Sequence, residues 1–344
     1  MNTLKEIILV KYAARFINET LKRSLLNSPP EIWIKIIRER LSAFDIPWTL
    51  KNEIITLLKP MALEVKNWRA DHKGIFTMLQ EWSTLKFCFN ADGTLNRIKT
   101  ADSLIRSKRL GAETRFVLAC QYWSSQNVFN VFGKIRNTLR NELLWKYSRQ
   151  NENFNEHEKN VVKWIVQYRA GSSFRFQPWG HFTDASLQSR RLNDLSELDC
   201  RSLLFQVFED TNQMHVGRFC LSRMSADHRE QLLALYPLKV LRIYLFRPYH
   251  QFFMETANKV WDLLSGKDFT RLLHIIICQK IVALWTDFDY VGLLRQFWHR
   301  SPNHLKQYVQ ETYIFEILME IVKNGFPLKE VPKLFSYTSP FFYV

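Results

Sequence analysis

Apolar residues recur every three or four positions along most of the chain, which is the spacing of one buried face of an α-helix. The N-terminal segment, with Ile7, Tyr12 and Phe16 near this spacing, is predicted to be helical from Thr3 to about Leu25. Residues 27–30 (Asn-Ser-Pro-Pro) end it, because the residue before a proline is biased away from the helical conformation. The same pattern predicts further helices beyond the prolines, including one from Trp48 to about Trp68.

From Asp102 onwards the predicted helices come in pairs joined by short turns. Glu113–Tyr122 and a helix from Val128 to about Leu139 form one such pair around the polar turn 124–127. Similar two-helix units are predicted at about 141–170, 200–224, 227–265, 268–300 and 302–335. We therefore predict an all-α protein of stacked antiparallel helical hairpins, arranged as an irregular array similar to an α-solenoid. The hairpins share no common register, so a regular sequence repeat is not predicted.

Two segments interrupt the helical pattern. Residues 84–98 (TLKFCFNADGTLNRI) place Asp92-Gly93 between two short runs of β-forming residues, which predicts one small β-hairpin near 85–98. Residues 171–182 (GSSFRFQPWGHF) hold two of the ten glycines and are predicted to form a long connecting loop. The expected organisation is an N-terminal helical region, 1–100, a first helical-hairpin block, 101–170, and a second, 183–344.

Composition agrees with a folded helical protein. Only 10 of the 344 residues are glycine and 11 are proline, too few for the many turns of a β-sandwich or barrel. The five cysteines are widely spaced, which argues against a disulfide framework or a structural zinc site. The sequence contains no run of eighteen uncharged apolar residues and no signal-peptide pattern at its start. We therefore expect no membrane span and an intracellular, cytoplasmic location.

Two resemblances also indicate helices. Residues 114–129 (TRFVLACQYWSSQNVF) resemble the helical hairpin of an ankyrin repeat, with Thr114, Leu118 and Ala119 where that pattern has its threonine, leucine and alanine. Residues 92–101 (DGTLNRIKTA) and 114–123 (TRFVLACQYW) are similar to segments of a large group of uncharacterised helical proteins found in spiders. This second resemblance implies a helical fold and carries over no functional residue.

Residues that could carry out chemistry are few and scattered. Cys120 lies on an apolar helical stripe far from any histidine, so we interpret it as a small core residue and not as a nucleophile. His274 and Cys278 share a helix face, but two ligands do not make a metal site. The sequence 287–289 (Asp-Phe-Asp) is interpreted as a turn in which an aspartate caps the helix beginning at Tyr290. Phosphate-loop, dinucleotide-binding and hydrolase motifs are absent, so no enzyme activity, metal or cofactor is predicted.

Charge indicates the strongest candidate for a binding surface. The chain carries 48 Lys and Arg against 33 Asp and Glu, and between Arg97 and Arg149 there are eleven basic and three acidic residues. The basic residues fall into two groups, Arg97, Lys99, Arg106, Lys108 and Arg109, and then Lys134, Arg136 and Arg140. Neighbouring hairpins could place both groups on one face, which would bind an acidic partner or phosphates. The alternative is an ordinary solvated surface.

The predicted connecting loop is a second candidate. Its aromatic and basic residues could anchor a partner or pack beneath the hairpins: Phe174, Arg175, Phe176 and Trp179. Together these features predict a non-catalytic protein–protein interaction module whose partner is a protein, and an acidic one if the basic surface is used. The alternative is sequence-non-specific nucleic-acid binding through the basic surface of residues 97–149. These patterns leave the oligomeric state open.

Overall fold

The structure is a computed structural model that describes residues 3–20, 30–76, 85–122, 125–148, 151, 153–169 and 189–326. Within these ranges the chain forms seventeen α-helices and no β-strand, which confirms the predicted all-α class. None of the helices in these ranges is long and apolar enough to cross a membrane. The chain divides into two compact units, one of residues 1–54 and 61–211 and one of residues 55–60 and 212–344.

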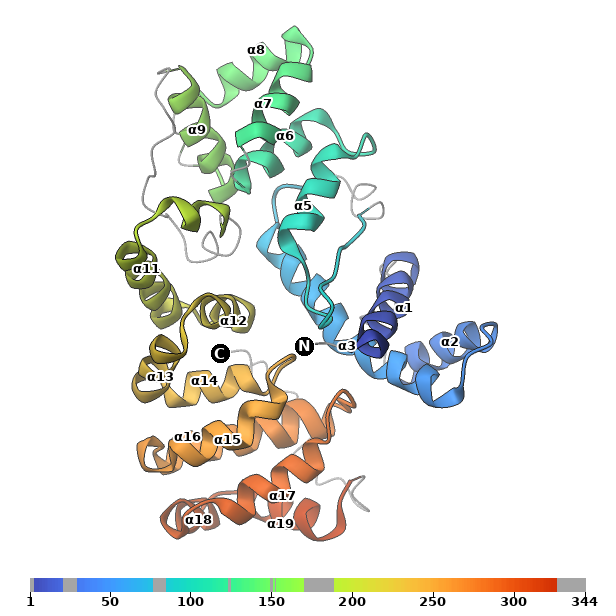
Figure 1. The fold of residues 1–344 in the computed structure, drawn as a ribbon, viewed down its shortest axis with the longest axis vertical. Helices are drawn as coiled ribbons and strands as arrows, with labels where there is room; N and C mark the ends of the chain where they lie inside the picture. Colours follow the sequence, from blue (N-terminus) through green and yellow to red (C-terminus); the bar gives the residue numbers. More distant parts are fainter. Residues whose placement is uncertain are drawn as a thin grey trace. The chain divides into compact units, whose positions relative to one another are not determined.

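Unit 1 contains nine α-helices among its described residues, and α6 packs on three of them, α5, α7 and α9. Its helices are α1 (Leu4–Thr20), α2 (Pro30–Ser42), most of α3 (Trp48–Asp71), α5 (Arg97–Arg106), α6 (Ala112–Gln121), α7 (Ser125–Lys134), α8 (Asn137–Lys146), α9 (Glu156–Arg169) and α11 (Glu197–Asp210), with the 3-10 turn η2 (Ser189–Asp194) (Figure 1). The ring of Phe116 in α6 lies 5.3 Å from Phe132 of α7 and 5.4 Å from Trp164 of α9. Phe132 and Trp164 are themselves 5.4 Å apart, so α6, α7 and α9 pack together around these three rings.

Unit 2 is a stack of short helices, and Figure 1 shows α14 to α19 in successive layers. Its elements are α12 (Met214–Arg223), α13 (Ala226–Leu235), α14 (Pro237–Tyr244), η3 (His250–Phe252), α15 (Phe253–Lys259), η4 (Trp261–Leu263), α16 (Gly266–His274), the π-helix η5 (Ile275–Val282), α17 (Tyr290–Arg300), α18 (Asn303–Gln310) and α19 (Ile314–Asn324). Phe253, Phe269 and Phe297 are fully buried at its centre, and the last two rings lie 4.9 Å apart.

Side-chain caps set where several of these helices begin. The side chains of Ser196, Ser225 and Ser265 each accept a hydrogen bond from the backbone N–H three residues later. Such a bond satisfies one of the N–H groups that a helix leaves unpaired in its first turn. Asp289 does the same for α17, because its Oδ1 accepts from the N–H of Gly292 at 2.8 Å. The predicted aspartate cap before Tyr290 is therefore confirmed.

The predicted β-hairpin near 85–98 is wrong. Only an isolated bridge between Phe89 and Leu95 forms there, around a turn in which Gly93 has a φ of +85°. The residues that precede the bridge find side-chain partners instead of a strand. The N–H of Phe87 donates to Asn18 Oδ1 at 2.7 Å, and the N–H of Cys88 donates to a threonine hydroxyl of α5 at 3.0 Å. Because α5 begins at residue 97, the second predicted strand has no room to extend.

Candidate functional site

Helices α6 and α7 form an antiparallel hairpin that brings the predicted basic residues together. Phe116, in the middle of α6, lies opposite Phe132 near the end of α7. The last turn of α7 therefore lies beside the first turn of α6. The segment 107–111 joins α5 to α6 at this same end. The end of α5 with the segment after it therefore lies at the same end of the hairpin as the end of α7, although some 25 positions separate them in the sequence.

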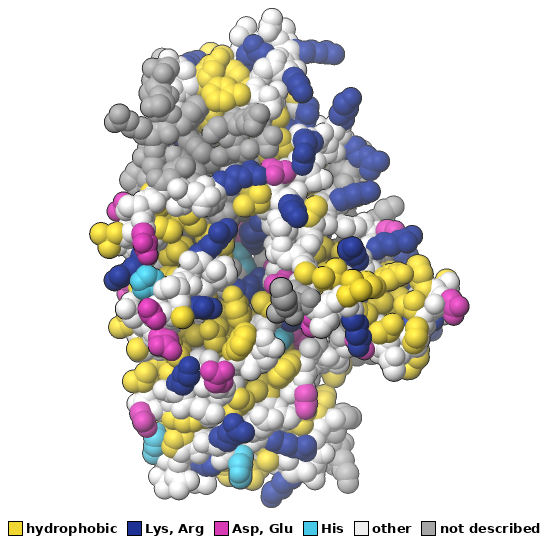
Figure 2. Space-filling model, in the orientation of Figure 1, with side chains coloured by type: hydrophobic (Ala, Val, Ile, Leu, Met, Phe, Trp, Pro, Cys, Tyr) yellow, Lys and Arg dark blue, Asp and Glu magenta, His cyan; other side chains and the backbone are white. Residues whose placement is uncertain are grey.

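Five exposed cations occupy this end of the helices, and we call them the basic end: Arg106, Lys108, Arg109, Lys134 and Arg136. Among the described residues, none of the five forms an ion pair with a carboxylate. The first turn of α6 adds the partial positive charge of its helix dipole. Figure 2 shows Lys and Arg side chains projecting along the right-hand edge over α5 to α8, with few acidic side chains among them.

The other predicted basic residues have different surroundings. Lys99 is exposed on α5, two turns before Arg106. Arg97 is largely buried, and its guanidinium lies 2.6 Å from the carboxylate of Asp71. Arg140 donates to the backbone carbonyls of residues 133 and 135, which end helix α7. These two arginines stabilise the fold. The predicted anchors Phe174, Arg175, Phe176 and Trp179 lie outside the described residues.

Helix α8 crosses the same end of the hairpin. Its Lys146 amine lies 3.1 Å from the carboxylate of Glu113 in the first turn of α6, and the Tyr147 hydroxyl donates to that carboxylate. This pairing neutralises an acidic residue next to the basic end. The neighbouring Trp145 is 82% exposed. Arginine and tryptophan are the residue types that most often dominate the binding energy of protein interfaces.

Unit 1 also contains a buried polar network, which we call the histidine cluster: Trp68, His72, Gln121, Tyr122, His157 and Asn160. The amide oxygen of Gln121 accepts a hydrogen bond from the Asn160 amide at 2.9 Å and lies 3.0 Å from His157 Nδ1. The indole N–H of Trp68 donates to the Tyr122 hydroxyl at 2.9 Å. The network ties α3, α6 and α9 together with neutral groups.

The ring of His72 is held neutral inside this network. It stacks on the indole of Trp68 with a centroid separation of 3.8 Å, and its Nδ1 lies 2.6 Å from the Trp68 carbonyl oxygen. Burial lowers the pKa of His72 to about 3, opposed by the backbone hydrogen bond to Trp68. Burial likewise lowers the pKa of His157. Both imidazoles are therefore uncharged at neutral pH, which suits a structural role.

Unit 2 contains a buried lysine that lies between aromatic rings. Lys280 lies on the π-helix η5, and the residue is only 1% exposed. Its Nζ lies 3.6 Å from the ring centroid of Phe246, 3.8 Å from that of Trp285 and 5.3 Å from that of Tyr290. No hydrogen bond to Nζ is made by the residues that the structure describes. The amine thus faces π-electron density instead of oxygen atoms.

Three titratable residues lie close to this amine, and with Lys280 we call them the lysine cluster: His250, Asp287 and Tyr290. The Tyr290 hydroxyl lies 2.9 Å from His250 Nε2 and donates to Asp287 Oδ1 at 3.2 Å. Asp287 Oδ2 lies 3.6 Å from the same imidazole nitrogen, and this side chain is 1% exposed. A tyrosine hydroxyl therefore links an imidazole and a carboxyl group inside the core.

Burial disfavours every charge in the lysine cluster. Burial lowers the pKa of Lys280 to about 7, opposed by Asp287 and reinforced by Lys59, which belongs to the same unit. Burial also raises the pKa of Asp287, opposed mainly by Lys280, and lowers the pKa of His250 to about 3. The ring faces around Nζ favour the ammonium form and act against this loss of charge. Buried groups with such shifted pKa values are concentrated at functional sites.

The backbone around Lys280 is irregular. The N–H of Trp285 donates to the carbonyl oxygen of Lys280 at 2.9 Å, five residues back, which is the pairing of a π-turn. Leu284 follows with a φ of +54°, a conformation that residues other than glycine rarely adopt. Short π-helical segments occur frequently at functional sites. Sequence reasoning missed this site, although a lysine inside the apolar run 275–282 was a usable signal.

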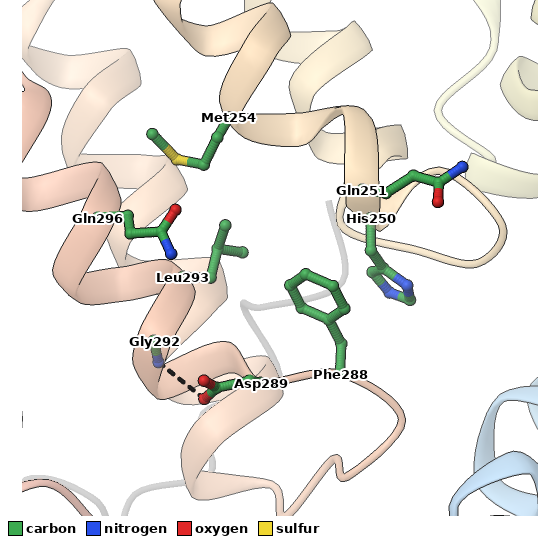
Figure 3. A pocket seen from close by; sticks show the side chains of 8 residues that line it. All are labelled: His250, Gln251, Met254, Phe288, Asp289, Gly292, Leu293 and Gln296. Atoms are coloured by element: carbon green, nitrogen blue, oxygen red, sulfur yellow. Dashed lines mark hydrogen bonds between the residues drawn. The ribbon is translucent and has the colours of Figure 1, made fainter.

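A pocket of about 160 Å³ lies beside the lysine cluster (Figure 3). Met254, Leu293 and Gln296 line one side, and the rings of His250 and Phe288 line another. These two rings stack with a centroid separation of 4.9 Å and an interplanar angle of 17°. His250 therefore belongs both to the pocket wall and to the lysine cluster.

The remaining candidates from the sequence are Cys120 and the pair of His274 and Cys278. Cys120 is fully buried, and burial raises the pKa of its thiol, which confirms its interpretation as a core residue. His274 Nε2 lies 4.0 Å from Cys278 Sγ. In the part of the chain that the structure describes, no three His, Cys, Asp or Glu side chains gather as a metal site.

The fold and these sites define an all-α protein with an exposed basic end in unit 1 and a buried lysine cluster in unit 2. No protein-family model, curated protein or solved structure matches the chain significantly. Geometry and charge are therefore the basis on which a function can be assigned.

Proposed function

We propose that this protein is a non-catalytic interaction module that binds an acidic segment of a partner protein through the basic end. The observation that carries this proposal is a group of five exposed cations at the C-terminal ends of α5 and α7 and in the segments that follow, without carboxylate partners among the described residues. Like charges held together raise the local electrostatic potential, which attracts an anionic partner and speeds its association.

The surroundings of the basic end favour a protein partner. The exposed ring of Trp145 lies on α8, next to the Lys146 that pairs with the first turn of α6, and offers an apolar anchor on a helix that contacts this end of the hairpin. An acidic segment with an apolar residue would use both features. Sequence-non-specific nucleic-acid binding is the second candidate, because the exposed Lys99 extends the row of cations along α5.

Fluorescence anisotropy tests the proposal with labelled oligoglutamate, DNA and RNA of equal total charge. We expect the peptide to bind, and the triple variant Arg106→Glu, Lys108→Glu and Arg109→Glu to weaken its binding at least about tenfold. The matched control reverses three exposed cations of unit 2: Lys267→Glu, Arg300→Glu and Lys323→Glu. Because both variants change the net charge equally, only the first should lose binding.

Three results would overturn the proposal. Equal weakening by both triple variants would mean that net charge, and not the basic end, attracts the peptide. Absence of peptide binding at low salt would exclude the basic end as an acidic docking surface. Tighter binding of nucleic acid than of peptide would promote the second candidate. Five phosphate contacts would then lose roughly 10²–10³ in affinity between about 50 and 200 mM salt.

A further inference from the structure

The lysine cluster has features that a purely structural lysine does not require. A buried amine without a hydrogen-bond partner is costly, and an apolar side chain of similar length would fill the same space at lower cost. Lys280 nevertheless points its amine at two ring faces, on an irregular helix, with Tyr290 and Asp287 nearby. This arrangement is independent of the basic end, so a role for Lys280 does not rest on the proposed function.

We propose that Lys280 is a reactive amine that binds a small, uncharged aldehyde or ketone covalently as an imine. An amine must be neutral to attack a carbonyl carbon, and an apolar site with a second cation nearby keeps a lysine neutral. Burial and Lys59 act in this direction here, and Asp287 acts against them. A hydrated lysine with a pKa near 10.4 is neutral in only about one molecule in 2,500 at pH 7.

The reaction balances without any further reagent. The amine nitrogen of Lys280 bonds to the carbonyl carbon and gives a carbinolamine, and loss of its oxygen as water leaves the C=N bond. The two hydrogens of that water come from the amine nitrogen. Transfer of a proton to the leaving oxygen needs an acid, and Asp287 is the candidate: burial raises its pKa, it interacts electrostatically with Lys280, and it accepts a hydrogen bond from Tyr290.

Two of the rings that cover the amine reach the surface of the protein. Phe246 and Trp285, which contact Nζ, are themselves partly exposed. Trp285 lies in the short segment 283–289 that joins η5 to α17 and contains the strained Leu284. A rotation of the indole would expose Nζ to a molecule of a few heavy atoms. Because the amine is otherwise enclosed, we expect only small carbonyl compounds to reach it.

Reductive trapping in the native protein tests this proposal. Acetaldehyde with cyanoborohydride at pH 7 converts an imine to a stable secondary amine, and peptide mapping by mass spectrometry locates it. We expect Lys280 to be modified at least about tenfold faster than the exposed Lys267, and the Lys280→Met variant to lose this fast phase. Modification of Lys280 at or below the rate of Lys267, or only after addition of denaturant, would overturn the proposal.

The route to the amine has its own test. Trp285→Phe replaces the indole by a smaller ring, keeps the site aromatic, and should speed the modification of Lys280 several-fold. Trp298→Phe is the matched control, because this half-buried tryptophan of unit 2 packs on Phe269 and Phe315, away from Lys280. Unchanged or slower trapping in Trp285→Phe, with a native circular dichroism spectrum, would contradict entry past the indole.

Discussion

The two units bury polar groups in different ways. In unit 1 the histidine cluster is linked by hydrogen bonds between neutral side chains, and the nearby charges of Arg97 and Asp71 are paired at 2.6 Å. In unit 2 the amine of Lys280 and the Oδ2 of Asp287 make no hydrogen bond to a described residue. The first arrangement pairs its charged groups and leaves only the Nε2 of His72 without a described partner, whereas the second leaves both an amine and a carboxyl oxygen without a hydrogen bond.

This difference indicates that the polar groups of unit 1 stabilise the fold, whereas those of unit 2 are candidates for a chemical role. A satisfied buried network specifies how helices pack, and breaking it is costly because the groups that remain lose their partners. An unsatisfied buried group lowers stability, so its retention calls for another explanation, such as reactivity. Stability measurements can therefore test whether the two units differ in this way.

The largest effect is expected from the buried ion pair of unit 1. Asp71→Ala leaves the guanidinium of Arg97 largely buried without its carboxylate, because the two side chains are only 3% and 12% exposed. We expect the free energy of unfolding to fall by about 3–5 kcal/mol, measured by urea denaturation. The control is Glu113→Ala, which breaks the exposed pair with Lys146 and should cost at most about 1 kcal/mol. Similar losses in both variants would show that burial does not distinguish these pairs.

A substitution in unit 2 is expected to raise the free energy of unfolding and not to lower it. Lys280→Met replaces an amine that lacks a hydrogen-bond partner by an apolar side chain of similar length. Asp287 then keeps its bond to Tyr290, and its raised pKa allows it to take up a proton instead of carrying an isolated charge. We expect the free energy of unfolding at pH 7 to rise by about 1–3 kcal/mol. A loss of stability would mean that the lysine cluster is satisfied after all and would remove the contrast between the units.

The stability gained by Lys280→Met should also depend on pH. The pKa of Lys280 is about 7 in the folded protein and near 10.4 in an unfolded chain. Between these values the unfolded chain binds a proton that the folded protein does not, so the stability of the wild type rises with pH. The advantage of the variant should therefore shrink from pH 7 to pH 10 in parallel urea titrations. A constant advantage would indicate that Lys280 keeps its proton in the folded state.

The sequence predicted the helical class but not the irregular segments. Helical spacing is a local signal, and it correctly placed a helix from Trp48 and an aspartate cap before Tyr290. The Asp92-Gly93 turn is also local, but a strand needs a partner along its length. Phe87 bonds to Asn18, 69 residues away, in place of a strand. Contacts of this range are not visible in a pattern of neighbouring residues.

In the candidate sites, too, the sequence did not predict contacts between residues far apart in the chain. Convergence of the basic groups could be predicted, because it follows from pairing two neighbouring helices. The burial of Arg97 could not, because its partner Asp71 lies on α3, 26 residues earlier. The surroundings of Lys280 could not be predicted either. Phe246 reaches the amine from 34 positions away, and a run of isoleucines around the lysine indicated only a buried helix.

The smallest effect is expected from the exposed charges of unit 1. The basic-end variant Arg106→Glu, Lys108→Glu and Arg109→Glu changes residues that make no ion pair with a described carboxylate. Each substitution should alter the free energy of unfolding by at most about 0.5 kcal/mol, because charged groups in water are solvated in both states. Urea denaturation should therefore leave this variant close to the wild type while it loses the labelled peptide. A large loss of stability would instead give these cations a structural role like that of Arg97, and the basic end would no longer be free to bind a partner.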